Sequence, residues 1–371
     1  MKLSKKLGFL FGYTFPLAIV VSYYWGGAAW TFTGFLYAYA LVPLLDELVN
    51  RDPHNVEKND FEELTQSRYF DVLVYSNVYI QYGLLFWGSW LLTFDNLTLF
   101  QQAGLVLSLG VYAAGIINIA HELGHRQNPL AQWHARAALL SVSYMHFVIE
   151  HNRGHHVHVA TPQDPASSKK DQTVFAFWKQ TLLGSYRSAW KIEEKRLQRE
   201  QKPLWSAANE MIWFAILPVL FCGLLTVLFS ILANHFVWQV PVFFIMQSIV
   251  AILSLECVNY IEHYGIARRE LSPGKYERVN PLHSWNANHL MSNLILFQLQ
   301  RHSDHHAFAS RPYQVLRHFD ESPQLPFGYP VMILMSLVPP LWFSIMNKEL
   351  ESWQANASDA EHIARIAKQF A

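Results

Sequence analysis

Six apolar stretches of membrane-spanning length limit how this 371-residue chain can fold more than any other feature. A transmembrane helix needs about 20 mainly apolar residues. The stretches lie at 8–27, 28–45, 70–93, 100–120, 211–233 and 237–258. Short links join them in pairs at Gly26–Ala28, Phe94–Asn96 and Asn234–Phe236. We therefore predict an all-α integral membrane protein with six transmembrane helices in three hairpins.

Positive charge lies on only one side of these hairpins. None of the three links contains Lys or Arg, whereas Lys2, Lys5 and Lys6 begin the chain and basic residues follow each hairpin. Basic residues mark the cytoplasmic side of a membrane protein. Both termini and the two long segments, about 121–210 and 259–371, are therefore expected in the cytoplasm. A soluble helical core is the alternative, and it would not explain this asymmetry.

The composition excludes several other classes of protein. The chain has 28 Lys and Arg against 28 Asp and Glu, so a nucleic-acid binder that relies on a strongly basic surface is excluded. Its only cysteines are Cys222 and Cys257. Two cysteines cannot build a disulfide scaffold, a four-cysteine zinc site or a cysteine-ligated iron–sulfur cluster.

Eight of the 18 histidines lie in three short windows. The windows are HELGH (His121–His125), HNRGHH (His151–His156) and HSDHH (His302–His306). Residues at i, i+3 and i+4 share one face of a helix, so each window can direct two imidazoles at one point. Imidazole is a common ligand for zinc, copper, iron and nickel. The three windows therefore predict a metal site.

The number of histidines favours two metals over one. A mononuclear site uses about four to six ligands, fewer than the eight or nine imidazoles available here. His121 directly follows the fourth apolar stretch, and the other windows lie in the two long segments after the hairpins. We expect all three to converge beneath the helices, as a histidine-rich two-metal cap at the cytoplasmic edge of the membrane.

Two other functions remain open at this stage. HELGH matches the HExxH motif of zinc proteases, in which two histidines bind zinc and the glutamate is the base. A protease needs one zinc and a third ligand, which leaves the other windows unexplained. A metal transporter usually places ionisable residues near the bilayer midplane, where most of these stretches have none. An enzyme that acts on a membrane-dissolved substrate fits better.

A redox enzyme of this kind needs electrons from another protein. No Gly-x-Gly-x-x-Gly fingerprint follows a strand, so neither a bound NAD nor a bound flavin is expected. We therefore expect a small external electron carrier to dock on the cytoplasmic face. The helix pattern at Lys191–Glu200 predicts an ordinary solvated helix, with a docking face for an acidic protein as the alternative.

Four sequence segments resemble the histidine boxes of the membrane-bound alkane monooxygenases. They are HELGHRQ (His121–Gln127), EHNRGHHVHVATPQDPASS (Glu150–Ser168), NYIEHYG (Asn259–Gly265) and LQRHSDHHAFASRPYQ (Leu299–Gln314). HSWNANH (His283–His289) and PLLDE (Pro43–Glu47) also resemble family segments. The resemblance runs from about residue 25 to about residue 347. Desaturases and sterol hydroxylases share only the histidine spacing, and xylene-type monooxygenases are nearer relatives and the main alternative.

The resemblance implies a function for the whole chain. It implies one desaturase/hydroxylase-like domain over residues 1–371, in a bacterial inner membrane, with a non-haem di-iron site. It implies terminal hydroxylation of n-alkanes to 1-alkanols with O2, with electrons from NADH through a rubredoxin reductase and rubredoxin. The di-iron centre itself would be catalytic, with no separate acid or base.

The resemblance also assigns residues. Nine ligands follow by position: His121, His125, His151, His155, His156, His263, His302, His305 and His306. His263 joins this set only through NYIEHYG. Residues expected around the ligands are Glu122, Glu150, Asn259, Glu262, His283, His289 and Asp304, the carboxylates by accepting imidazole N–H groups. No metal role is expected for His54, His134, His146, His158, His235, His318 and His362.

The second apolar stretch offers a hypothesis about the substrate. On an α-helix, Gly34, Ala38, Leu41 and Leu45 form one stripe. The resemblance implies that this helix lines the substrate channel, and the small Gly34 and Ala38 would leave the channel open to alkanes above about ten carbons, each buried methylene adding roughly 0.8 kcal/mol. The alternative is close helix–helix packing, which small residues four apart also favour.

Overall fold

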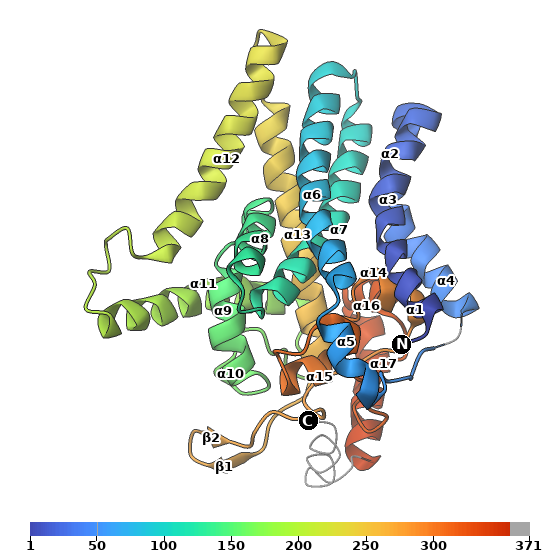
Figure 1. Cartoon of the computed structure of the whole chain (residues 1–371), viewed down its shortest axis with the longest axis vertical. Helices are drawn as coiled ribbons and strands as arrows, with labels where there is room; N and C mark the ends of the chain where they lie inside the picture. The colour runs from blue at the N-terminus through green and yellow to red at the C-terminus, as the bar shows by residue number, and fades with distance from the viewer. Residues whose placement is uncertain (50, 357–371) are drawn as a thin grey trace.

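A computed structural model describes residues 1–49 and 51–356 of the chain, so His362 lies outside the described residues. The described chain is mostly helical, with long helices standing side by side above a region of short helices and loops (Figure 1). The only paired strands in this part of the chain are β1 (Glu270–Ser272) and β2 (Lys275–Tyr276), an antiparallel hairpin with Glu270 opposite Tyr276.

The N-terminal part is a series of short helices. In chain order they are α1 (Leu3–Gly8), η1 (Phe9–Tyr13), α2 (Thr14–Gly26), η2 (Gly27–Trp30), α3 (Thr33–Leu36), η3 (Tyr37–Leu41), α4 (Val42–Leu48), η4 (Lys58–Asp60) and α5 (Phe61–Thr65). The segment η3 is a π-helix, in which each turn holds an extra residue. It therefore rotates the faces of α4 relative to those of α3.

Two hairpins of long helices form the centre. They are α6 (Arg68–Phe94) with α7 (Leu99–Gly124), and α12 (Glu210–Ala233) with α13 (Gln239–His263). Thr98 begins α7 in a capping box with Gln101, which satisfies the free N–H groups at the helix start. Between the hairpins lie α8 (Pro129–Leu140), α9 (Phe147–Glu150), the π-helix η5 (His151–His155), α10 (His156–His158) and α11 (Val174–Arg199).

The last described elements are helices below the bundle. These are α14 (Leu290–Ile295), α15 (His302–Ala307), η6 (Tyr313–Val315), α16 (Tyr329–Ser336) and α17 (Pro339–Asn356). A fully buried Arg301 holds α15 in place, because its guanidinium donates hydrogen bonds to the carbonyl oxygens of Leu316 and Asp52 at 2.7 and 2.9 Å. The N-terminal and C-terminal parts are thereby joined next to a histidine window.

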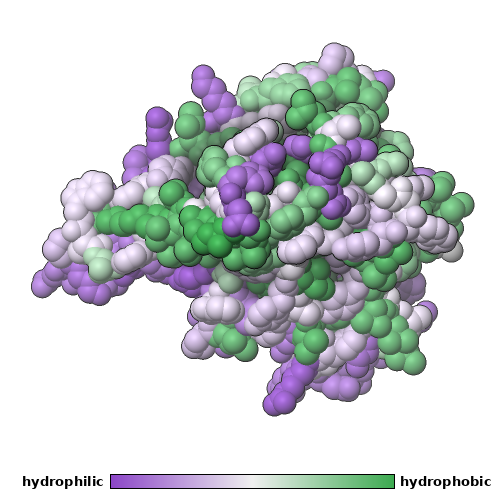
Figure 2. All heavy atoms as spheres, turned by 90° about the horizontal axis from the view of Figure 1, so that it is seen from above, coloured by the Kyte–Doolittle hydropathy of each residue, from purple (hydrophilic) through white to green (hydrophobic). Residues whose placement is uncertain are grey.

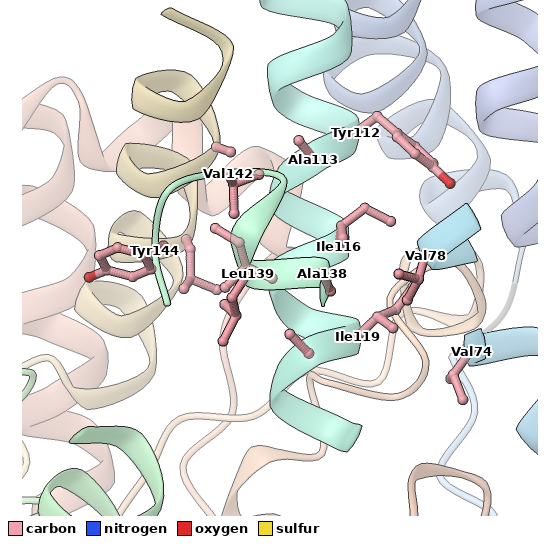
Figure 3. Packing of buried hydrophobic residues seen from close by; sticks show 14 of the residues in the cluster. Val74, Val78, Tyr112, Ala113, Ile116, Ile119, Ala138, Leu139, Val142 and Tyr144 are labelled. Carbon is pink, nitrogen blue, oxygen red and sulfur yellow. The ribbon is translucent and has the colours of Figure 1, made fainter. Parts of the chain in front are cut away.

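Helix α7 is the centre of the hydrophobic core. Figure 3 shows Ile116 and Ile119 of α7 between Val78 of α6 and Leu139 of α8. Helix α13 packs so closely on the opposite side that a Cβ added at Gly110 would lie 2.6 Å from the Cβ of Val250. The ends of α7 and α13 are therefore fixed, and both ends carry a predicted metal ligand.

Four helical segments of the described chain are long and apolar enough to cross a membrane. They are Leu3–Trp30, Leu99–Gly124, Glu210–Ala233 and Gln239–His263. Seen from above, hydrophobic residues run along the arm at the left of the view, where α11 and α12 project (Figure 2). Val219, Leu224 and Ile231 of α12 are 71%, 68% and 68% exposed. These surfaces are those of a multi-pass membrane protein.

The prediction of six spans is met only in part. Helix α6 is long enough, but it carries the buried polar residues Asn77 and Gln81, which lower its apolar character. The second predicted span, 28–45, is divided among η2, α3, η3 and α4 rather than being one helix. Six spans and the cytoplasmic position of the cap therefore stay predictions.

Candidate metal centre

Nine histidines gather at the ends of α7 and α13 and on the short segments η5, α10 and α15. They form two groups, and within each group the ligand nitrogens all lie within 4.8 Å of one another. The five-histidine group is His121, His125, His151, His156 and His305. The four-histidine group is His155, His263, His302 and His306. These are the nine residues that the family resemblance assigned as ligands.

The π-helix η5 decides how the second window is divided. On an α-helix His151 and His155 would share a face, but a π-turn brings residues five apart together. The Nε2 atoms of His151 and His156 accordingly lie 3.0 Å apart, in the five-histidine group. His155 points instead toward His263 and His306 of the other group, with ring centroids 4.9 and 4.8 Å away.

The short helix α15 also contributes to both groups. His302 and His306 follow the expected i, i+4 spacing, and their Nε2 atoms lie 2.8 Å apart. His305, between them in sequence, faces the other way, with its Nε2 2.7 Å from that of His121. The second and third windows are therefore each shared between the two groups.

The donor set fits two metal ions. Metal–nitrogen bonds of about 2.1 Å place opposite ligand nitrogens about 4.2 Å apart, close to the spread within each group. The Nε2 atoms of His125 and His155 are buried and have no hydrogen-bond partner. Burial lowers the pKa of His125 to about 3 and that of His305 well below its usual value. Burial thus keeps these two imidazoles neutral, which is the form that binds metal.

Two carboxylates approach the four-histidine group. The fully buried Asp164 accepts a hydrogen bond from His155 Nδ1 at 2.9 Å and another from the Ser167 hydroxyl at 2.6 Å. Burial alone would raise the pKa of Asp164, but His155 and Ser167 hold it below its usual value. Glu262 Oε2 lies 3.1 Å from His302 Nε2, and its other oxygen accepts the Tyr329 hydroxyl at 2.8 Å.

Asp164 was not among the residues that sequence reasoning selected. It lies within the second box, but no helical spacing connects it with His155, because a loop lies between them. The only signal was the Asp-Pro pair nine residues after His155, which indicates a turn. Its contact with Nδ1 leaves Nε2 of His155 free for a metal, as carboxylates commonly do for metal-binding histidines.

The other predicted carboxylates have different partners. Glu122 accepts two hydrogen bonds from the Arg126 guanidinium, at 3.0 and 3.2 Å, so it is not free to act as the base of an HExxH protease. Asp304 accepts three hydrogen bonds from Arg317, at 2.7 to 3.1 Å. Burial and the nearby Asp164 raise the pKa of Glu150 to about 8, and its Oε1 has no partner.

The remaining residues expected around the ligands are Asn259, His283 and His289. The Asn259 amide donates to Glu256 at 3.1 Å, and His283 Nε2 lies 3.2 Å from Glu277. His289 is 2% exposed and its Nδ1 has no partner. None of the three belongs to either histidine group.

An apolar cavity of about 100 Å³ lies inside the bundle. Its lining includes Asn118, one turn before His121, and Leu299, three residues before His302. Ala38 also lines the cavity, but Gly34 does not: it packs against α7, where the Ser108 hydroxyl accepts its N–H at 3.0 Å. Leu41 is exposed, and neither Leu41 nor Leu45 lines the cavity, because the π-helix η3 breaks the α-helical stripe.

Comparison with known proteins identifies the family. A sequence model of the fatty acid desaturase family matches residues 98–335. Alkane 1-monooxygenase 2 of Pseudomonas aeruginosa is 41% identical over 359 residues, which cover 95% of this chain and 93% of the relative. Alkane 1-monooxygenase 2 of Alcanivorax borkumensis is 40% identical, with 89% and 85% covered. The chain belongs to the alkane 1-monooxygenase family.

Family membership decides between the alternatives left open by the sequence. The chain is a membrane monooxygenase enzyme, and its histidine groups fit a non-haem metal site. The xylene/toluene monooxygenase hydroxylase component of Pseudomonas putida is also similar, at 28% identity over 338 residues. This lower identity, over a similar share of the chain, places the chain nearer the alkane enzymes, as the histidine boxes predicted.

Proposed function

We propose that this chain hydroxylates n-alkanes at the terminal carbon to 1-alkanols, using O2 at a histidine-ligated di-iron site. The observation that carries the proposal is the pair of buried histidine groups near an apolar cavity in a chain about 40% identical to alkane 1-monooxygenases. Two bound iron ions would supply the oxidising chemistry. The five-histidine group would hold one ion and the four-histidine group the other.

The protein's own residues position the substrate and exclude water. An alkane has no polar group, so affinity comes from burial, at about 0.8 kcal/mol for each methylene. The walls around Val111, Ile116 and Leu255 provide this apolar surface. Asp164 keeps the proton on Nδ1 of His155, and the burial of the other imidazoles keeps them neutral.

Electrons would come from NADH through a rubredoxin reductase and rubredoxin. A basic groove of about 780 Å³ on the histidine side supports a docking site for a small acidic carrier. Its lining includes Arg153, Lys191 and Lys195, which form no ion pair with any described residue, and the buried Asp164. Opposite charge speeds the encounter of two such proteins, so the alternative interpretation of Lys191–Glu200 gains support.

The distribution of basic residues supports a membrane topology for the chain. Residues 1–371 would form one domain with six transmembrane segments in a bacterial inner membrane. The histidine groups and both termini would face the cytoplasm, where the basic residues lie. Cysteine scanning with a membrane-impermeant reagent in intact cells tests this: a residue placed at Asn234 should react from outside and one at Lys170 should not.

A reconstituted assay tests the function itself. Purified protein with NADH and an alkane alone should be inactive, and adding rubredoxin and its reductase should give a 1-alkanol. Mass spectrometry of the product position separates this from other oxidations. Hydroxylation of xylene but not of alkanes would contradict the proposal, as would one bound zinc with peptidase activity.

The position of Ala38 in the cavity lining gives a prediction about alkane chain length. Ala38→Trp fills the cavity wall, so it should reduce turnover of alkanes above about ten carbons more than that of shorter ones. Ala40→Trp is the matched control, because Ala40 is exposed on the same segment. Competition between alkanes of two lengths, read by gas chromatography, measures the ratio. An equal loss at all lengths would assign Ala38 to helix packing.

A further inference from the structure

A much larger hollow than the proposed substrate cavity lies elsewhere on the bundle. Helices α12 and α13 meet near their link, where Leu225 and Phe229 contact Val237 and Val240. From there the two helices separate toward α11, and Figure 1 shows the wedge between them. The space is an open groove of about 910 Å³.

The groove has apolar walls along its length. They include Pro218 and Val227 of α12 and Phe244 and Ile252 of α13. The α13 lining extends from residue 241 to residue 252, which is about 16 Å at the rise of an α-helix. A hydrocarbon chain is the ligand that such walls favour.

One end of the groove is polar. Tyr186 and Arg187 of α11 line it there, together with His146. The Nε2 atom of His146 is buried and has no hydrogen-bond partner. Arg187 is exposed and forms no ion pair or hydrogen bond with any residue that the structure describes. A guanidinium group and an imidazole nitrogen without a hydrogen-bond partner therefore lie at one end of an apolar groove.

The polar end lies where a membrane surface is expected. Trp205 and Trp213, between α11 and the first turn of α12, are 78% and 43% exposed. Tryptophan is enriched at the boundary between lipid and water. Helix α11, which carries Arg187, lies across the foot of α12 (Figure 1).

From this arrangement we infer that the groove binds one anionic phospholipid of the bilayer. An acyl chain lies between α12 and α13, the phosphate pairs with Arg187, and the headgroup is within reach of His146. Arginine favours phosphate because its N–H groups match two oxygens at once. The bound lipid fills the wedge, so α12 is supported by lipid on the side where protein contacts are missing.

Two variants separate the contributions of the lipid's phosphate headgroup and its acyl chain. Arg187→Gln removes the cation, and Lys179→Gln, an exposed cation on the same helix outside the groove, is its control. Gly223→Phe adds a ring on the groove wall, at a position where a Cβ meets nothing within 4 Å. Gly83→Phe on α6 is its control, since Gly83 is also exposed and unobstructed.

Native mass spectrometry of the full chain, delipidated and reloaded with phosphatidylglycerol or phosphatidylcholine, tests the inference without turnover. The wild type should retain one phosphatidylglycerol at least tenfold better than phosphatidylcholine. Arg187→Gln should lose this preference, Gly223→Phe should lose both lipids, and the controls should match the wild type. Three outcomes would overturn the lipid inference. The wild type could retain the two lipids equally, both groove variants could bind lipid unchanged, or a 1-alkanol could displace the lipid.

Discussion

The two histidine groups hold the same kind of ligand in different electrostatic surroundings. Asp164 and Glu262 lie within 3.1 Å of histidine nitrogens in the four-histidine group. Among the described residues no carboxylate hydrogen-bonds to a histidine of the five-histidine group, whose rings contact mainly one another. A carboxylate partner raises the basicity of a ligating imidazole. The two sites are therefore distinguishable, because the four-histidine group has one imidazole fewer and two carboxylates beside it.

The largest effect is expected from removing a ligand. His125→Ala removes one of five imidazoles and His263→Ala one of four. Both variants should reduce hydroxylation more than about 100-fold. His263→Ala should also lose its bound metal more readily than His125→Ala. Metal content by mass spectrometry and turnover measure this. His54→Ala is the control, because its side chain is 76% exposed. Near-normal turnover in either variant would remove that histidine from the ligand set.

A smaller effect is expected from Asp164→Asn. The amide keeps the shape and can still accept the His155 N–H, but the negative charge is lost. Changes to such partners typically cost about 10- to 100-fold in metal affinity or activity. Metal titration should show weakening at one of the two sites only, while Asp171→Asn, an exposed acid in the same loop, should behave like the wild type. Equal weakening at both sites would contradict the distinction between the groups.

The smallest effect is expected near the five-histidine group. Glu122 pairs with Arg126, which also contacts Asp71 at 2.5 Å, so Glu122→Gln should change stability rather than chemistry. Turnover should change by less than about threefold, equivalent to about 0.6 kcal/mol, while the melting temperature falls. Paired melting and turnover curves measure the two effects. Loss of one bound metal in Glu122→Gln would show that Glu122 acts on the five-histidine group.

The family boxes predicted which histidines would come together but not how they would divide. The structure gathers His121, His263 and the other seven, and their role as metal ligands stays a prediction. The i, i+4 rule did not indicate that His151 pairs with His156, since the π-turn of η5 is not visible in the residue pattern. The same limitation affected the stripe through Leu41, where η3 rotates the helix.

Neighbouring carboxylates were the least predictable part of the site. Because Glu122 and Asp304 are adjacent to ligands in sequence, they were expected to accept imidazole N–H groups. In the structure Glu122 pairs with Arg126 and Asp304 with Arg317. Asp164 reaches His155 because the chain turns back after α10, and such a contact depends on tertiary structure. The long helices were easier to locate, since the apolar composition of α7, α12 and α13 is sufficient to define them.

The interleaving of the windows has a consequence for metal uptake. Because η5 with α10, and α15, each supply imidazoles to both groups, an ion bound in one group also restricts the segments that supply the other. The second ion then binds imidazoles whose freedom is already reduced, and this part of the entropy is lost only once. Iron should therefore enter the apoprotein with a sigmoidal isotherm and a Hill coefficient above one, and singly loaded protein should be scarcer at half-saturation than two independent sites would give.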